Sequence, residues 1–151
     1  MREGRPTLED LRALFDRQRF AVLATTQENG RPYTNLMAFA VSNDLQSMVL
    51  VTGRATRKYK NLCANPGVAL LIDNRSHEAS DIHEAMAVTV LGEAQEVSGD
   101  MRKRLTELFL SKHPYLKEFA LSPSCALLQV IVKSYYLVRR FQEVTEFHLR
   151  P

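Results

Sequence analysis

The chain has 151 residues, 45% of them apolar and 25% charged, with a formal net charge of +3. This length suits one domain with a single core, residues 1–151, and the ordinary composition excludes disordered, collagen-like and repeat proteins. The small net charge gives no indication of nucleic-acid binding. There is neither an apolar run long enough for a membrane span nor a basic-then-apolar leader, so we expect a cytoplasmic protein.

The first third of the chain predicts one helix followed by a β-meander. Apolar residues recur at helical spacing from Leu8 to about Arg19, after the helix-start pattern Thr7-x-x-Asp10. Asn29-Gly30 is a strong hairpin signal between two runs rich in β-formers. The strands predicted in this part are Phe20–Thr26, Tyr33–Val41 and Met48–Thr52.

A basic segment follows the third strand and opens a short helix. Thr56 is its predicted N-cap, and Asn65-Pro66-Gly67 stops it after Ala64. Cations are unfavourable at a helix N-terminus, which already carries partial positive charge, yet four cluster here: Arg54, Arg57, Lys58 and Lys60.

An anion would resolve this conflict of charge. Free N–H groups, the Thr56 hydroxyl and the side chains of Arg57 and Lys58 would then converge on one point, as in a phosphate site. Two alternatives stay open at this point. The cations are a solvated helix face, or they form a nucleic-acid patch, although no basic or aromatic residues extend such a patch elsewhere.

The remaining chain adds one helix and several strands. A polar irregular stretch, Asp73–Glu84, separates two strands, and Gly92 marks a bend or bulge in the second. A helix follows from Ser98 to about Lys112, and Pro114 ends it. The strands predicted here are Val68–Ile72, Met86–Val97, Cys125–Val132, Ser134–Phe141 and Val144–Leu149. Such a chain favours an α+β fold, mainly β with three peripheral helices, whose antiparallel sheet closes into a barrel.

Other candidate sites give weaker signals. His77 and His83 lie in an acidic loop, but their spacing fits no zinc pattern, so we expect no metal. Cys63 and Cys125 show no CxxC spacing, which predicts neither a zinc site nor a disulfide framework. His113 lies at a helix end, where a cation is favourable without any catalytic role.

The basic helix and its flanking strands resemble the flavin-binding split barrels related to pyridoxamine 5′-phosphate oxidase. In that family a strand ending in Thr leads to a Ser/Thr-Arg-Lys triplet and then to an Asn-Pro helix stop. The order of elements agrees from about residue 11 to residue 132. The matching residues are Thr52, Thr56-Arg57-Lys58 and Asn65-Pro66, with Gly30-Arg31-Pro32 upstream.

The resemblance implies a six-stranded antiparallel split β-barrel that binds flavin mononucleotide (FMN) in a homodimer interface, each site drawing on both chains. Arg57 and Lys58 would neutralise the phosphate, and Thr52 and Thr56 would add hydroxyl or backbone contacts. Asn35, Leu36 and Met37 would lie on the strand that faces the flavin ring and offer it backbone groups. The alternative for these three is plain barrel core.

The sequence departs from the family's vitamin oxidase. The strand NLMAFAV, residues 35–41, carries no cation at its end, and the ending Phe147-His-Leu-Arg-Pro151 lacks the Arg/His substrate pair. The resemblance therefore implies an oxidoreductase relative with another small substrate, not vitamin B6 oxidation. A ligand carrier without turnover, holding flavin, haem or a deazaflavin, is the alternative.

The last predicted strands resemble a stretch that lies near the flavin or ligand in smaller split-barrel relatives. By strand alternation, Tyr135, Arg139 and Phe141 share one face, and Tyr136, Arg140 and Gln142 share the other. The first group is our candidate lining of a substrate pocket. The alternative is that the tyrosines are packing residues.

Overall fold

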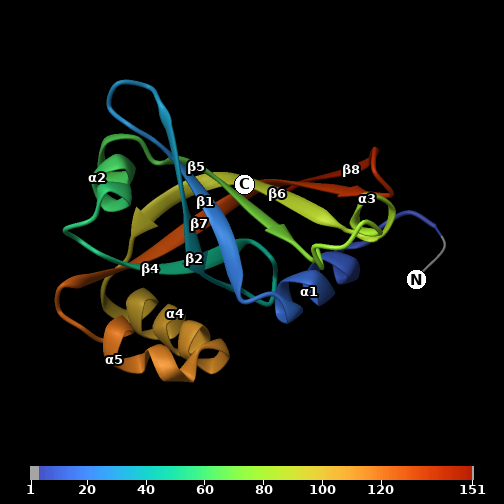
Figure 1. The fold of residues 1–151 in the computed structure, drawn as a ribbon. Helices are drawn as coiled ribbons and strands as arrows, with labels where there is room; N and C mark the ends of the chain where they lie inside the picture. Colours follow the sequence, from blue (N-terminus) through green and yellow to red (C-terminus); the bar gives the residue numbers. More distant parts are fainter. Residues whose placement is uncertain (1–3, 151) are drawn as a thin grey trace.

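The computed structural model, which describes residues 4–150, contains one antiparallel sheet that curls around a core (Figure 1). The strands follow one another in the order β2-β1-β5-β6-β7-β4-β3. The remaining strand, β8, pairs with the C-terminal part of β7, which β4 does not reach. Their bounds are β1 Phe20–Thr26, β2 Pro32–Ala38, β3 Ala40–Val41, β4 Ser47–Gly53, β5 Gly67–Asp73, β6 Ala87–Glu96, β7 Cys125–Arg139 and β8 Glu143–His148.

The sheet closes on itself through the segment that holds β2 and β3. These strands stand at the two ends of the sheet order, yet only Phe39 separates them along the chain. Counted as one bent strand, they give six barrel strands, to which β8 is added. The six-stranded split barrel implied by the resemblance is therefore confirmed, and a bend at Phe39 divides the predicted strand Tyr33–Val41.

Within residues 4–150, five α-helices and one short 3₁₀ turn surround the sheet. The structure confirms α1 (Leu8–Arg17), α2 (Arg57–Ala64) and α4 (Gly99–Lys112) close to their predicted bounds. It adds α3 (Asp81–Glu84), the 3₁₀ turn Pro114–Leu116 and α5 (Lys117–Ala120), so the prediction of three helices was too low. The added helices are only one turn long, which is too short for a periodic apolar pattern to reveal them.

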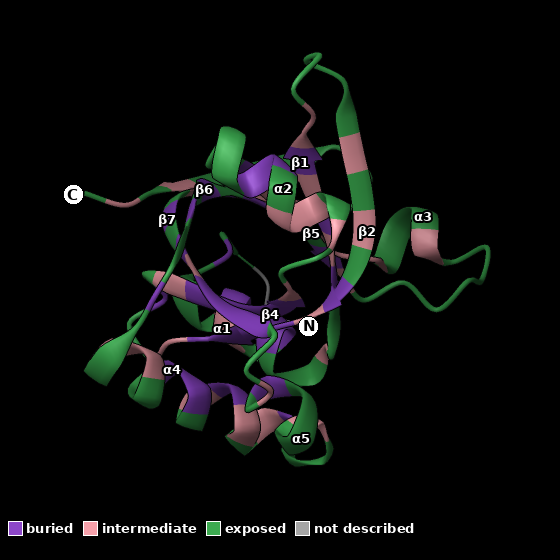
Figure 2. Cartoon of the chain, turned by 90° about the vertical axis from the view of Figure 1, so that its left-hand side faces the viewer, coloured by how far each residue is buried: buried purple, intermediate pink, exposed green. Residues whose placement is uncertain are grey.

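Buried apolar side chains of the described residues form two clusters. Figure 2 colours all buried residues purple. The larger cluster fills the barrel and includes Leu11 and Phe15 of α1 together with Leu62 of α2. The smaller cluster lies where Leu105 and Phe109 of α4 pack against β4 and β7. The larger cluster thus holds α1 and α2 against the barrel, and the smaller one holds α4.

The C-terminal strands differ from the prediction. Cys125–Val132 and Ser134–Phe141 are parts of one strand, β7, which ends at Arg139. Leu91 pairs with Ser134 while Gly92 pairs with Val132, so Lys133 of β7 is the extra residue of a bulge that lies opposite Gly92, where a bend or bulge was predicted. The bulge shifts the alternation of β7 by one residue, which is why the sequence looks like two strands.

Within the described residues, no helix combines the length and apolar character needed to cross a bilayer.

Candidate functional site

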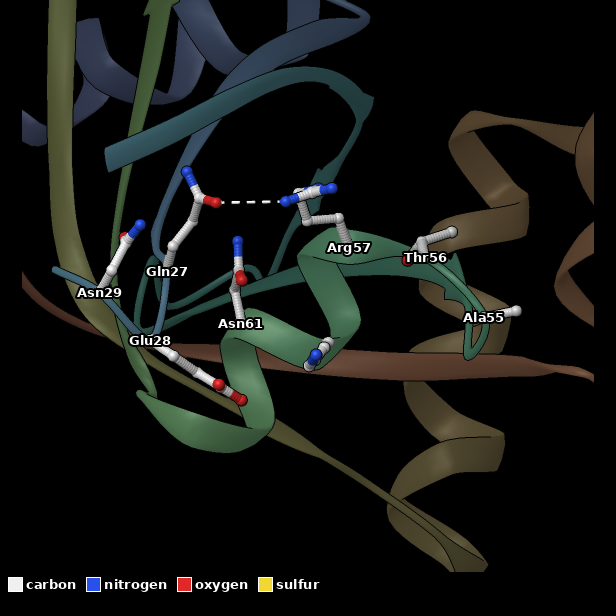
Figure 3. Close-up of a pocket in the computed structure, with 8 residues that line it drawn as sticks. Gln27, Glu28, Asn29, Ala55, Thr56, Arg57 and Asn61 are labelled. Carbon is white, nitrogen blue, oxygen red and sulfur yellow. Dashed lines mark hydrogen bonds between the residues drawn. The ribbon is translucent and has the colours of Figure 1, made fainter. Parts of the chain in front are cut away.

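A cavity of about 480 Å³ lies between the N-terminal half of α2 and the tip of the β1–β2 hairpin (Figure 3). The hairpin loop turns at Gly30, whose φ of +85° suits glycine. The Gln27 N–H donates to the Arg31 carbonyl, and the Gly30 N–H donates to the Gln27 carbonyl. The cavity is lined by Gln27, Glu28, Asn29, Ala55, Thr56, Arg57, Lys60 and Asn61.

Thr56 caps α2 as predicted. Its Oγ1 accepts the Tyr59 N–H at 3.3 Å and donates to the Gly53 carbonyl at 2.9 Å. The hydroxyl of Thr52, a residue only 1% exposed, lies 3.0 Å from the Thr56 hydroxyl and 3.2 Å from the same carbonyl. Both hydroxyls are therefore engaged within the strand-to-helix turn, which they hold in shape.

The turn leaves the first two amides of α2 available. Among the described residues, the N–H groups of Arg57 and Lys58 have no recorded acceptor, whereas Tyr59 and Lys60 donate to Thr56. The first turn of the helix contains no acidic side chain. An anion at this point would meet free backbone donors at the positive end of the helix dipole.

Arg57 reaches across to the hairpin. Its guanidinium donates to Gln27 Oε1 at 3.2 Å, drawn as the dashed line in Figure 3, and lies 5.8 Å from the centroid of the Tyr33 ring. The residue is nevertheless exposed. Gln27 thus orients a cation toward the cavity without neutralising its charge.

Arg54 is different, because it already has an anionic partner. It donates to Glu96 Oε2 at 2.7 Å and to the Pro123 carbonyl at 2.7 Å. The bond from Arg54, followed by that from the Tyr59 hydroxyl, holds the pKa of Glu96 below its usual value. The same carboxylate raises the pKa of Tyr59 to about 12. One of the four clustered cations is therefore balanced by β6.

The two lysines differ in their position relative to the cavity, which the sequence did not indicate. Lys60 lines the main cavity and a neighbouring cavity of about 640 Å³ on the Cys63 side of α2. Lys58 is half-buried and lines neither, and it has no ion-pair or hydrogen-bond partner within residues 4–150. Three cations, Arg57, Lys58 and Lys60, thus lack a carboxylate partner within residues 4–150.

Asn35, Leu36 and Met37 lie on β2, at one end of the sheet order, so one edge of their strand is unpaired. Leu36 is 65% exposed on the outer face, whereas Met37 is buried inside. Asn35 Nδ2 contacts the Met37 sulfur at 3.0 Å, but Oδ1 is enclosed without a hydrogen-bond partner among the described residues. A buried acceptor without a donor fits a ligand or water that supplies one.

The proposed pocket residues of the C-terminal strand do not come together. Tyr135 is fully buried in the barrel, where its hydroxyl donates to the Leu45 carbonyl at 2.6 Å, and burial raises its pKa. Arg139 lies at the end of β7 and pairs with Glu143 at 2.9 Å. Phe141 lies in the following turn and is 62% exposed. The predicted alternation fails after Arg139 because the strand ends there.

Sequence reasoning missed several residues of the site. Gln27, Glu28 and Asn61 line the cavity, and Asn61 Nδ2 donates to Thr25 Oγ1 at 3.0 Å, tying α2 to β1. The hairpin signal at Asn29-Gly30 could have placed residues 27–29 at a loop tip. No local pattern could have brought that tip to α2.

Comparison with protein-family models matches residues 7–139 to the family described as pyridoxamine 5′-phosphate oxidase. Among proteins with curated functions, no sequence match is found. The family match covers both sides of the cavity, the hairpin and α2.

Solved structures share the fold at low sequence identity. A haem-binding protein from Mycobacterium smegmatis matches with a TM-score of 0.85 and 18% identity, over 97% of this chain and 60% of that one. Campylobacter jejuni ChuZ matches with a TM-score of 0.80 and 13% identity, over 93% of this chain and 58% of that one. A Clostridium acetobutylicum protein related to general stress protein 26, of the pyridoxinephosphate oxidase family, matches at 0.71 and 17%, over 94% of both chains. The chain thus spans about 60% of the length of the first two neighbours.

Proposed function

The chain belongs to the pyridoxamine 5′-phosphate oxidase family, and from this premise we propose that it binds FMN and acts as an oxidoreductase on a small substrate. The observation that carries the proposal is the group of three unbalanced cations around the open N-terminus of α2. A phosphate is dianionic near neutral pH and would offset them.

The residues at this site fit such a cofactor. Arg57, Lys60 and the first amides of α2 would hold the phosphate, with Lys58 adding charge, while Thr52 and Thr56 keep the turn in shape. The unpaired edge of β2 and the unpartnered Oδ1 of Asn35 would meet the polar side of the ring. Bound flavin supplies the hydride or electron transfer, and the protein contributes binding, orientation and exclusion of water.

A homodimer is part of the proposal. Apolar side chains of neighbouring strands meet on the outer face, where Val22 of β1 pairs with Leu36 of β2 on one side and Leu71 of β5 on the other. Leu36 and Leu71 are 65% and 38% exposed. An apolar face of this kind on a folded domain supports association. Burying β2 in a subunit interface would also enclose a cofactor lying on its free edge.

The test is the affinity of apoprotein for FMN, measured by fluorescence titration. We expect Arg57→Ala combined with Lys58→Ala to weaken binding at least tenfold, or about 1.4 kcal/mol, because charge-assisted bonds to the phosphate are lost. Lys103→Ala with Arg104→Ala, an exposed basic pair on α4, is the matched control and should leave affinity unchanged.

Equal FMN affinity in the wild type and the Arg57/Lys58 double variant, with both folded by circular dichroism, would contradict the phosphate assignment. Identification of the chromophore released from purified protein separates FMN from the alternatives. Release of haem or a deazaflavin would replace FMN by that ligand. If a reductant bleaches the visible absorbance of the bound flavin and air restores it, the redox role is supported.

A further inference from the structure

Another cavity, of about 210 Å³, lies at the opposite end of the sheet from α2 (Figure 1). The start of α1, the α3 segment and the end of β7 enclose it, and it shares no lining residue with the cavity at α2. This volume is below the ~300 Å³ at which typical drug-sized ligand sites begin, so the cavity suits a ligand no larger than an amino acid.

Two consecutive arginines face this cavity. Strand alternation would send Arg139 and Arg140 to opposite faces, but both line it. The backbone explains this, because β7 ends at Arg139 and Arg140 has a φ of +49°, in the left-handed region. Phe141 follows with a φ of +72°. Such conformations cost about 1–3 kcal/mol each for non-glycine residues and are concentrated at functional sites.

Only some of the charges around the cavity are committed to partners. Arg139 pairs with Glu143 at 2.9 Å and also donates to the Gly4 carbonyl. Asp10 Oδ2 accepts the Thr7 N–H at 2.7 Å, within the capping box of α1. These groups hold the walls in place and are poorly placed to bind a ligand.

The groups with a weak partner or with none are of both signs. Arg140 reaches Glu143 only at 3.8 Å, and its side chain is 44% exposed. Within residues 4–150, neither His83 nor Glu84 of α3 has a recorded side-chain partner, and both line the cavity. A purely anionic ligand would face the Glu84 carboxylate, and a purely cationic one would face Arg140. Pro6 and Met86 add an apolar part to the lining.

We propose that this cavity binds a small zwitterion, an α-amino acid with an apolar side chain. Its carboxylate pairs with Arg140 and accepts a hydrogen bond from His83, its ammonium pairs with Glu84, and its side chain packs on Pro6 and Met86. Opposite charges at two separate points also give orientation, which a single ion pair does not. The site is independent of the proposed flavin function.

Isothermal titration calorimetry of the full chain with L-leucine, L-valine and L-methionine tests this site. We expect saturable binding of at least one of them. Its analogues that lack either charge should bind at least tenfold more weakly: for leucine these are 4-methylpentanoate and 3-methylbutylamine. An absence of saturable heat with all three amino acids overturns the proposal, as does equal affinity for an analogue of a single charge.

Charge-neutral variants locate the binding. Arg140→Gln and Glu84→Gln should each weaken amino-acid affinity at least tenfold and leave FMN affinity unchanged. Arg104→Gln and Glu107→Gln, exposed on α4, carry the same chemical changes away from the cavity and should have no effect. If both cavity variants bind the amino acid with wild-type affinity, the amino acid binds elsewhere and the proposal is overturned. Flavin titration of the same samples reports separately on the site at α2.

Discussion

His113 is a buried histidine that connects the end of α4 to the bend between β2 and β3. It is 1% exposed, and its Nε2 lies 2.8 Å from the Phe39 carbonyl. Because a carbonyl can only accept, Nε2 carries the proton and donates. Nδ1 is enclosed and has no hydrogen-bond partner among the described residues. The neutral ring therefore supports the bend at which β2, the expected flavin strand, ends.

The buried position makes this contact sensitive to pH. Desolvation lowers the pKa of His113 below its usual 6.5, outweighing the bond to Phe39. In the unfolded chain the ring takes up a proton as pH falls below 6.5, whereas the folded ring resists until its lower pKa. The contribution of His113 to stability is thus complete above pH 6.5 and declines as pH falls through this window.

We predict that His113→Leu lowers the free energy of unfolding by about 1–3 kcal/mol at pH 7.5, because the Phe39 carbonyl loses its donor inside the protein. Urea unfolding followed by circular dichroism measures this. The difference in free energy of unfolding between wild type and variant should be smaller at pH 5, because only the wild type must keep the ring neutral. His83→Leu, exposed on α3, is the control. A constant gap across this pH range would refute the titration argument.

At the scale of elements, the bulge between β6 and β7 sets the shape of the longest strand. A Cβ built at Gly92 would lie 2.5 Å from the Ile131 carbonyl oxygen and 2.9 Å from Val130 Cγ1. The extra residue opposite, Lys133, points outward and pairs with Glu93 at 2.9 Å. The close approach of the two backbones explains why glycine is required here.

Gly92→Ala should therefore destabilise the protein by about 1–3 kcal/mol, as expected for forced overpacking. Urea denaturation gives the value. Gly67→Ala, on the adjacent strand, is the matched control, because its Cβ would meet Asn65 Oδ1 at an ordinary 3.6 Å. Equal stability of the two variants would show that the strands separate without strain.

At the scale of the whole molecule, the outer face of the sheet is apolar on several neighbouring strands. Besides Leu36 and Leu71, its exposed members include Phe20 of β1, Leu91 of β6 and Val144 of β8, at 56%, 39% and 56% exposure. Strand pairing and burial patterns place all five on the face opposite the barrel core. A second copy of the chain would cover this face in the proposed dimer.

We predict that Leu36→Asp and Leu71→Asp each shift the protein from dimer to monomer in sedimentation velocity experiments and weaken FMN binding with it. A charge buried in an apolar interface carries a desolvation penalty that Asp on a free surface avoids. Leu121→Asp, next to α5 and 55% exposed, should leave the dimer intact. A wild-type protein that binds FMN as a monomer would contradict this arrangement.

The sequence by itself determined the features that depend on neighbours along the chain. The cap at Thr56, the stop after Ala64, the Asn29-Gly30 hairpin and the bulge at Gly92 were all confirmed. Each follows from backbone constraints or hydrogen bonds within a few residues, so local residue types specify it. The cluster of cations at α2 could be seen for the same reason.

Only the tertiary structure decided which of these groups meet. Arg54 pairs with a carboxylate of β6, and Arg57 donates a hydrogen bond to Gln27. Tyr135 is buried, and Arg139 and Arg140 line one cavity. These contacts join residues far apart in the chain, or depend on where a strand ends and its alternation stops. They are fixed by packing of the whole barrel, which no short window of sequence contains.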